Sequence, residues 1–158
     1  AGSADRAWLR DKQEQRSRRA EAQTIFRSVR SGGARSIFIK KGRIVMKHLN
    51  PGKRLSGAVV SNGNVYISGQ VADDPNASLE EQARQVLAKI DGYLQQAGSS
   101  RSKLAMVNIF LPNIMDFDAM NAVYDAWLDL PVAPARATIE ARLANPSLRI
   151  EVSAIAEV

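Results

Sequence analysis

Arg136 lies in the middle of PVAPARATIEARL, residues 131–143, a stretch that is otherwise mostly small and apolar, and its guanidinium could bind an anion. Strand alternation places Arg136, Thr138 and Glu140 on one face. A buried guanidinium needs an anion, because an unpaired buried charge is costly. In the structural interpretation, Arg136 forms an ion pair with Glu151 on the last strand, or it lies at a strand end where its side chain reaches water. The functional interpretation is a fork that binds a ligand carboxylate.

Two further residues are weaker candidates for a binding site. Gly69 lies in Ser-Gly-Gln at the end of an expected strand, where a glycine permits either a β-bulge or the close approach of a ligand or another chain. Asn121 lies in an expected helix, where a single asparagine is usually exposed. The only histidine, His48, is expected at the surface. No glycine-rich phosphate loop and no other cofactor motif is recognisable.

The elements that would position these residues follow from hydrophobic periodicity and turn signals. Ser78 is a plausible N-cap for the first helix, and Gly98 ends it. The expected elements are strands at 55–61 and 65–72 joined by Asn62-Gly63-Asn64, a helix at 79–97, a strand at 102–112, a helix at 116–128, and strands at 131–143 and 148–158. This ββαβαββ order predicts an α+β fold, one sheet with two helices on one face.

A sheet covered on one face leaves the other face without a partner. Apolar strand residues outnumber those that two helices can cover, so we expect the uncovered face to be apolar and to pack against other copies. The residues assigned to this surplus are Val107, Ile109, Ile139, Ala141, Val152 and Ala154.

The charge is distributed unevenly along the 158 residues. Residues 1–45 hold 12 Lys/Arg and 4 Asp/Glu, hence +8, and residues 46–158 hold 10 and 12, hence −2; together they give the net +6. The division predicts a basic extension at 1–45, partly helical over 5–30, followed by a hairpin at 36–49, and a domain at 46–158. The extension is interpreted as a tag or upstream segment, or as a native extension that contacts the domain or an anionic partner.

Composition narrows the class of protein. There is no cysteine, so disulfides, thiolate metal sites and cysteine nucleophiles are excluded. No apolar run approaches the ~20 residues of a membrane span, and no signal peptide is recognisable. We therefore expect a cytoplasmic protein without a membrane contact, a metal or a cofactor.

Five segments together resemble the RidA/YjgF family of reactive-intermediate (enamine/imine) deaminases. They are VYISGQVADD, EQARQVLAKIDGYLQQAGSS, DFDAMNAVYDAW, PVAPARATIEARL and RIEVSAIAEV. The resemblance implies a chorismate-mutase-like homotrimer in which three sheets line a barrel and ligands bind in clefts between subunits. It covers residues from about 47 to 158, and residues 1–45 have no counterpart.

The resemblance also implies roles for single residues. Arg136 matches the arginine that binds the substrate carboxylate, and Glu151 matches the glutamate that positions a water. Gly69 matches a backbone contact in the cleft, and Asn121 matches a cleft asparagine. The implied reaction is hydrolysis of small 2-enamino or 2-imino acids, such as 2-aminoacrylate, to 2-keto acids and ammonia without a cofactor.

Two positions depart from the family pattern. Thr138 stands where well-known members carry a cysteine, and Leu55 stands where they carry a cleft tyrosine. These departures keep a second hypothesis open, a non-catalytic binder of small carboxylates that acts as a regulator or metabolite sensor. A third, RNA binding or cleavage, is disfavoured because residues 46–158 carry a net charge of −2.

Overall fold

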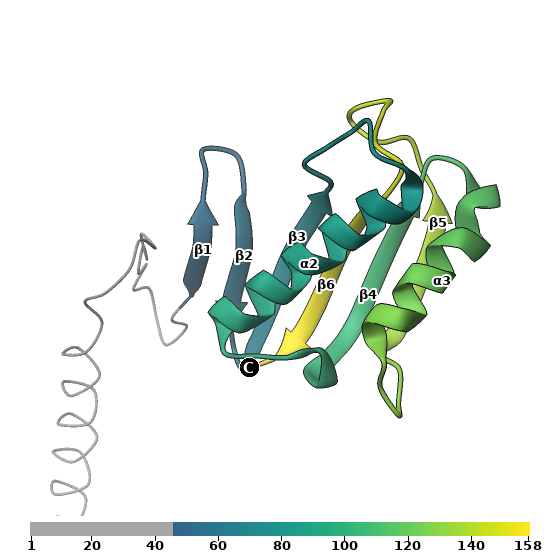
Figure 1. Ribbon diagram of the computed structural model, residues 1–158. Coiled ribbons are helices and arrows are strands. Elements are labelled where there is room, and N and C mark those ends of the chain that lie inside the picture. The colour runs from purple at the N-terminus through teal and green to yellow at the C-terminus, as the bar shows by residue number, and fades with distance from the viewer. Residues whose placement is uncertain (1–45) are drawn as a thin grey trace, which may run out of the picture. The chain divides into compact units, whose positions relative to one another are not determined.

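A mixed six-stranded sheet organises residues 46–158, the part of the chain that the computed structural model describes (Figure 1). The strand order is β1-β2-β3-β6-β4-β5, and only the β4–β5 pair is parallel. The elements are β1 (Lys47–Pro51), β2 (Ser56–Ser61), β3 (Asn64–Val71), α2 (Leu79–Ala97), β4 (Leu104–Leu111), α3 (Phe117–Leu128), β5 (Ala135–Glu140) and β6 (Glu151–Glu157), with short 3₁₀ turns at Arg101–Lys103 and Ile114–Asp116. The predicted α+β fold with two helices is therefore confirmed for this part of the chain.

Turn and cap residues place the first elements where the sequence predicts them. Asn62 and Gly63 both adopt positive φ angles, 50° and 76°, which suits the tight turn between β2 and β3. The Ser78 Oγ accepts a hydrogen bond from the backbone N–H of Glu81, and Gly98 ends α2 in the left-handed conformation. Helix α2 therefore begins and ends at the predicted residues.

The prediction missed strand β1. It pairs antiparallel with β2, with His48 opposite Val59, and so adds an edge strand before the expected ββαβαββ order. Strand β1 overlaps the end of the hairpin that we expected at 36–49. The rest of that hairpin and the helix expected at 5–30 lie outside the described residues.

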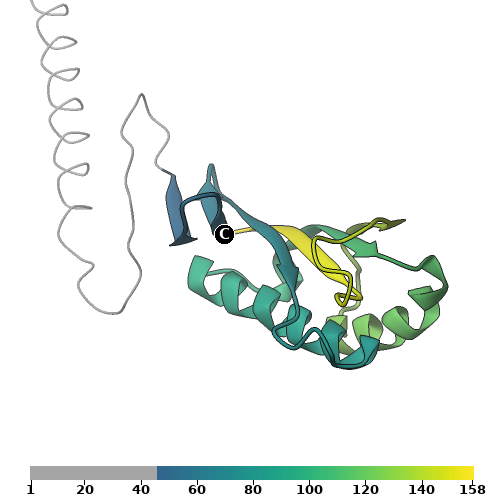
Figure 2. The same ribbon diagram turned by 90° about the horizontal axis from the view of Figure 1, so that it is seen from above.

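Both helices pack on the same face of the sheet, as the view along it shows (Figure 2). The helix-covered face is lined by side chains such as Val65, Ile67, Val107, Ile109, Leu111, Val152, Ala154 and Ala156, all of them buried. The prediction that Val107, Ile109, Val152 and Ala154 belong to an uncovered apolar surplus was therefore wrong. Strand β4 is apolar on both faces, so its alternation alone did not reveal which side the helices cover.

The opposite face of the sheet has no covering layer within residues 46–158 (Figure 2). Tyr66 on β3 is 45% exposed and Ile139 on β5 is 51% exposed. Phe110 and Ile155 are half-buried on the same face. An uncovered apolar face is thus present, and Ile139 is the residue of the predicted set that the structure places on it, together with side chains that were not predicted. Within the described part of the chain, no helix is both long and apolar enough to cross a membrane.

Three side chains tie helix α3 to helix α2. The Asp91 carboxylate accepts hydrogen bonds from the Arg101 Nε at 2.8 Å and the Trp127 Nε1 at 3.0 Å. The Arg101 guanidinium also donates to the Trp127 carbonyl and lies 5.0 Å from the centre of its ring. The hydrogen bonds that Arg101 donates to the Asp91 carboxylate raise the pKa of Arg101. This network fixes the C-terminal half of α3, which matters because α3 contacts Arg136.

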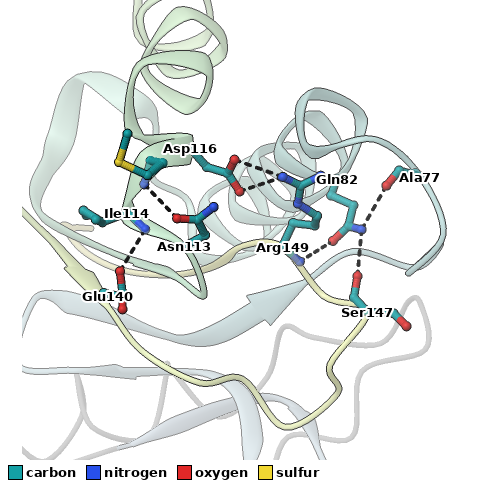
Figure 3. A network of polar contacts seen from close by, with 9 residues as sticks. Ala77, Gln82, Asn113, Ile114, Asp116, Glu140, Ser147 and Arg149 are labelled. Atoms are coloured by element: carbon teal, nitrogen blue, oxygen red, sulfur yellow. Dashed lines mark hydrogen bonds and ion pairs between the residues drawn. The ribbon is translucent and has the colours of Figure 1, made fainter.

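A fully buried glutamine holds two loops at one end of the sheet (Figure 3). The Gln82 Nε2 donates to the backbone carbonyls of Pro75, Ala77 and Ser147 at 3.0–3.2 Å, and its Oε1 accepts from the Arg149 N–H at 2.9 Å. Arg149 in turn forms a double hydrogen bond with Asp116, just before α3. Gln82 therefore satisfies backbone groups of the loop between β3 and α2 and of the segment that precedes β6.

Replacing Gln82 by leucine is expected to lower the free energy of unfolding by roughly 2–4 kcal/mol, because four backbone groups lose their partner in a buried position. Urea denaturation of Gln82→Leu measures this change. The matched control is Gln95→Leu, on the exposed side of the same helix, where we expect little change. Equal stability of the two variants would show that the loops do not depend on Gln82.

Candidate functional site

Arg136 lies on the edge strand β5 and is exposed, so it is not the buried charge that the sequence suggested. Its Nη1 donates to the Asn121 Oδ1 at 2.9 Å. Its guanidinium carbon lies 4.8 Å from the centre of the Tyr124 ring and 5.7 Å from that of Phe117. Within residues 46–158, the Arg136 side chain forms no other hydrogen bond and no ion pair. The fork is thus oriented by α3, while donors remain for a ligand.

The three residues that hold Arg136 follow one another at helical spacing. Phe117, Asn121 and Tyr124 lie on the face of α3 that points to β5, at positions i, i+4 and i+7. Aromatic faces attract a guanidinium, so the two rings restrict where it can lie. The resemblance implied that Asn121 is a cleft asparagine, and the structure adds its contact with Arg136, while its role in a cleft stays a prediction. The aromatic partners were missed, because Tyr124 at helical spacing is indistinguishable from an ordinary core residue.

Two hydroxyl groups near this fork are buried without a hydrogen-bond partner in the described part of the chain. They are the Tyr124 Oη and the Thr138 Oγ1. Burial raises the pKa of the Tyr124 phenol, while the Arg136 charge acts in the opposite direction. Thr138 lies on the same face of β5 as Arg136, opposite Ile109 of β4 in the register. Thr138 therefore lies beside the fork, with a buried hydroxyl that has no partner among the described residues.

Glu151 and Gly69 meet on adjacent strands. A Cβ added to Gly69 would lie 1.8 Å from the Glu151 Oε1, so the carboxylate occupies the space that a side chain at Gly69 would need. The register slips by one residue between Ile67 and Gln70, which marks a β-bulge at this glycine. The β-bulge is therefore confirmed. The group that lies over Gly69 is the Glu151 side chain of the same chain, so the close approach of a ligand or of another chain stays a prediction.

Arg136 and Glu151 do not form the ion pair that neighbouring strands would allow, and that interpretation was wrong. Strand β4 lies between β5 and β6, so these two strands are two strand spacings apart, about 9–10 Å. Arg136 lies opposite Val107 of β4 and Glu151 opposite Phe110, so the two residues are also offset along the strands. They also point to opposite faces. Arg136 contacts helix α3, whereas Glu151 alternates with the buried Val152 and so faces the uncovered side.

The candidate residues thus form two separate groups. The guanidinium half-site consists of Arg136, Asn121 and Thr138 beside α3. The carboxylate half-site consists of Glu151 and Gly69 on the uncovered face. In one chain, neither half-site can place both a carboxylate-binding fork and a proton acceptor on the same small molecule.

Leu55 lies at the end of the sheet where β2 begins and β3 ends, the end that also holds Gly69. Leu55 is 64% exposed. It lines a pocket of about 440 Å³ at the turn between β1 and β2. His48 lines the same pocket and is half-buried, with its Nδ1 2.8 Å from the Ser56 Oγ, so the surface position expected for it was only partly right.

Comparison with known proteins gives the chain a family. The family model described as Endoribonuclease L-PSP matches residues 46–158. The RutC family protein of Haemophilus ducreyi is 39% identical over 99 residues, which are 63% of this chain and 85% of that protein. The RutC family protein YoaB of Escherichia coli K12 is 38% identical over 105 residues, which are 66% of this chain and 91% of that protein.

Solved structures show the same fold. NMB1025 of Neisseria meningitidis, a member of the YjgF protein family, is 37% identical with a TM-score of 0.68, over 71% of this chain and 93% of that one. YyfA of Yersinia pestis, a protein of unknown function in the conserved Rid family, is 33% identical with a TM-score of 0.64, over 68% and 90% of the two chains. The chain therefore belongs to the Endoribonuclease L-PSP family, the group whose members are also named RutC, YjgF and Rid.

Proposed function

We propose that this protein hydrolyses small 2-imino and 2-enamino acids to 2-keto acids and ammonia. The observation that carries the proposal is the Arg136 fork, which is oriented by Asn121 and two aromatic rings and still has donors directed to solvent. A fixed guanidinium favours a planar carboxylate over other anions, because it can donate two parallel hydrogen bonds. Every 2-imino acid carries such a carboxylate next to its reactive carbon.

The reaction itself makes modest demands on the site. An enamine first takes a proton at carbon and becomes the imine. Water then adds to the imine carbon while Glu151 accepts a proton from it, and the C–N bond of the resulting carbinolamine breaks as a proton reaches the nitrogen. The keto acid and ammonia leave, and no oxidant, metal or cofactor takes part. Because imines hydrolyse unaided, positioning by Arg136 supplies much of the acceleration needed.

The two half-sites have to come from two copies of the chain, since Arg136 and Glu151 face opposite sides of one sheet. The exposed apolar side chains of the uncovered face, with Tyr66 at 45% and Ile139 at 51%, support such an association. A homotrimer closes the three uncovered faces around one axis and produces three equivalent sites. We propose a cytoplasmic location for this assembly.

The test is an assay of the intact protein with 2-aminoacrylate generated in situ from an amino acid by a lyase. Keto-acid and ammonia release is expected to exceed the spontaneous rate and to scale with protein concentration. A rate that does not rise above the spontaneous one, for this imine and for larger imines of methionine and leucine, would overturn the proposal.

A second candidate is binding of small carboxylates without turnover. The observation in its favour is Leu55, an exposed apolar side chain at the position where the family resemblance implies a cleft tyrosine. The same assay separates the two functions, because a protein that only binds carboxylates releases no ammonia. In such a protein, an added carboxylate would still protect Arg136 from a reagent that modifies arginine. Cleavage of RNA has less support, since residues 46–158 carry two more acidic than basic residues, 12 against 10.

A further inference from the structure

A pocket of about 440 Å³ lies at the turn between β1 and β2, outside both half-sites. A hydrogen bond from the Gly52 N–H to the Leu55 carbonyl at 2.8 Å closes this turn. Lys53 and Arg54 therefore occupy its two corner positions, and both are exposed. The turn holds two cationic side chains side by side at the rim of the pocket.

The pocket wall carries basic groups and no acidic residue. Within residues 46–158, neither Lys53 nor Arg54 takes part in an ion pair, whereas Arg84, Lys89, Arg101 and Arg149 each pair with a carboxylate. His48 also lines the pocket, and since its Nδ1 is engaged with the Ser56 Oγ, its Nε2 is the ring nitrogen left for a ligand. The charge of the pocket thus favours an anion.

Leu55 connects this pocket to the proposed reaction. Its exposed side chain is part of the pocket wall, and it stands at the same end of the sheet as Gly69 and Glu151. A substrate whose side chain passes Leu55 would bring a terminal group to Lys53 and Arg54. A substrate as small as 2-aminoacrylate would leave the pocket unused.

We propose that the pocket is a subsite for a second acidic group, so that the preferred substrate is the 2-imino derivative of an acidic amino acid. This inference rests on the proposed function for the reaction, but anion binding by the pocket does not depend on it. In the complete site, Arg136 binds the carboxylate next to the imine and the β1–β2 turn binds the distal carboxylate.

Kinetics with two imines of equal length test the substrate class. The imines of glutamate and glutamine are generated in situ by amino-acid oxidases, and keto-acid release is measured. The intact protein is expected to show kcat/KM about tenfold higher for the glutamate imine, because hydrogen bonds to a charged group exceed those to an amide. Lys53→Gln combined with Arg54→Gln is expected to abolish this preference, because it lowers kcat/KM for the glutamate imine far more than for the glutamine imine. Equal kcat/KM for both imines in the intact protein would overturn the proposal.

Direct binding separates this inference from the proposed function. Glutarate and butyrate are titrated into the intact protein by calorimetry. We expect glutarate to bind more tightly, and the double variant to bind the two alike. The matched control combines Arg84→Gln with Lys103→Gln, which removes the same charge from exposed positions outside the pocket and is expected to keep the difference. Loss of glutarate affinity in the double variant without imine turnover would support the subsite and refute the deaminase. Glutarate binding that is unchanged in the double variant would refute the subsite.

Discussion

Replacing Arg136 by alanine is expected to lower kcat/KM for imine hydrolysis by about 100-fold or more, the effect typical of removing a preorganised donor to a charged group. The site loses the guanidinium that binds the substrate carboxylate. The Asn121 Oδ1 also loses its hydrogen bond from the Arg136 Nη1. Lysine at this position keeps the charge but cannot donate two parallel hydrogen bonds, so the kcat/KM of Arg136→Lys should lie between those of the parent and of Arg136→Ala. Keto-acid release at several substrate concentrations measures both variants.

The loss should be one of activity and not of stability. Arg136 is exposed on an edge strand and buries little area, so the melting temperature of Arg136→Ala is expected to stay within a few degrees of the parent. Arg84→Ala is the matched control, an exposed arginine on α2 whose carboxylate partner is a surface one. Arg136→Ala with full activity and an intact fold would remove the main support for the deaminase.

Replacing Glu151 by glutamine is expected to lower kcat by about 100-fold with little change in KM, because a general base contributes 10²–10⁴ to the rate and the carboxylate anchor is elsewhere. Glutamine has the same shape and so can still lie over Gly69. The separation of the two parameters distinguishes Glu151 from Arg136, whose loss weakens substrate binding as well. Initial rates over a wide range of imine concentration provide both.

Glu157 supplies the control for this variant, since it lies on the same strand and the same face but is exposed at the far end. Glu157→Gln should retain the parental kcat. An unchanged kcat in Glu151→Gln would assign the proton transfer to another group. A rise in KM at constant kcat would instead make Glu151 a binding residue.

Local structure was largely predictable from the sequence. Helix α2 has the bounds that Ser78 and Gly98 indicate, and the turn at Asn62 and Gly63 joins β2 to β3 as expected. These features depend on a few neighbouring residues, each with a strong conformational preference. The resemblance implied that Arg136 and Asn121 both belong to a cleft, but it did not predict the hydrogen bond between them.

The sheet order was less accessible. An Arg136–Glu151 contact required β5 and β6 to be neighbours, which the sequence left open. The helix between β4 and β5 permits a parallel pair of these two strands, and that pair separates Arg136 from Glu151. Which face of β4 the helices cover could not be inferred, because both faces of that strand are apolar. The contacts of Arg136 with Phe117 and Tyr124 depend on this packing, so only the structure reveals them.

The most direct test of the account is complementation between two inactive variants, because the central claim is that each site combines Arg136 of one copy with Glu151 of another. Arg136→Ala and Glu151→Gln are each assayed alone, then mixed in equal amounts, dissociated and reassembled. Random reassembly places both intact residues in about one quarter of the sites, so the mixture should regain about a quarter of the parental rate. A mixture that stays as inactive as its two components, although mixed assemblies are shown to form, would contradict a site shared between copies.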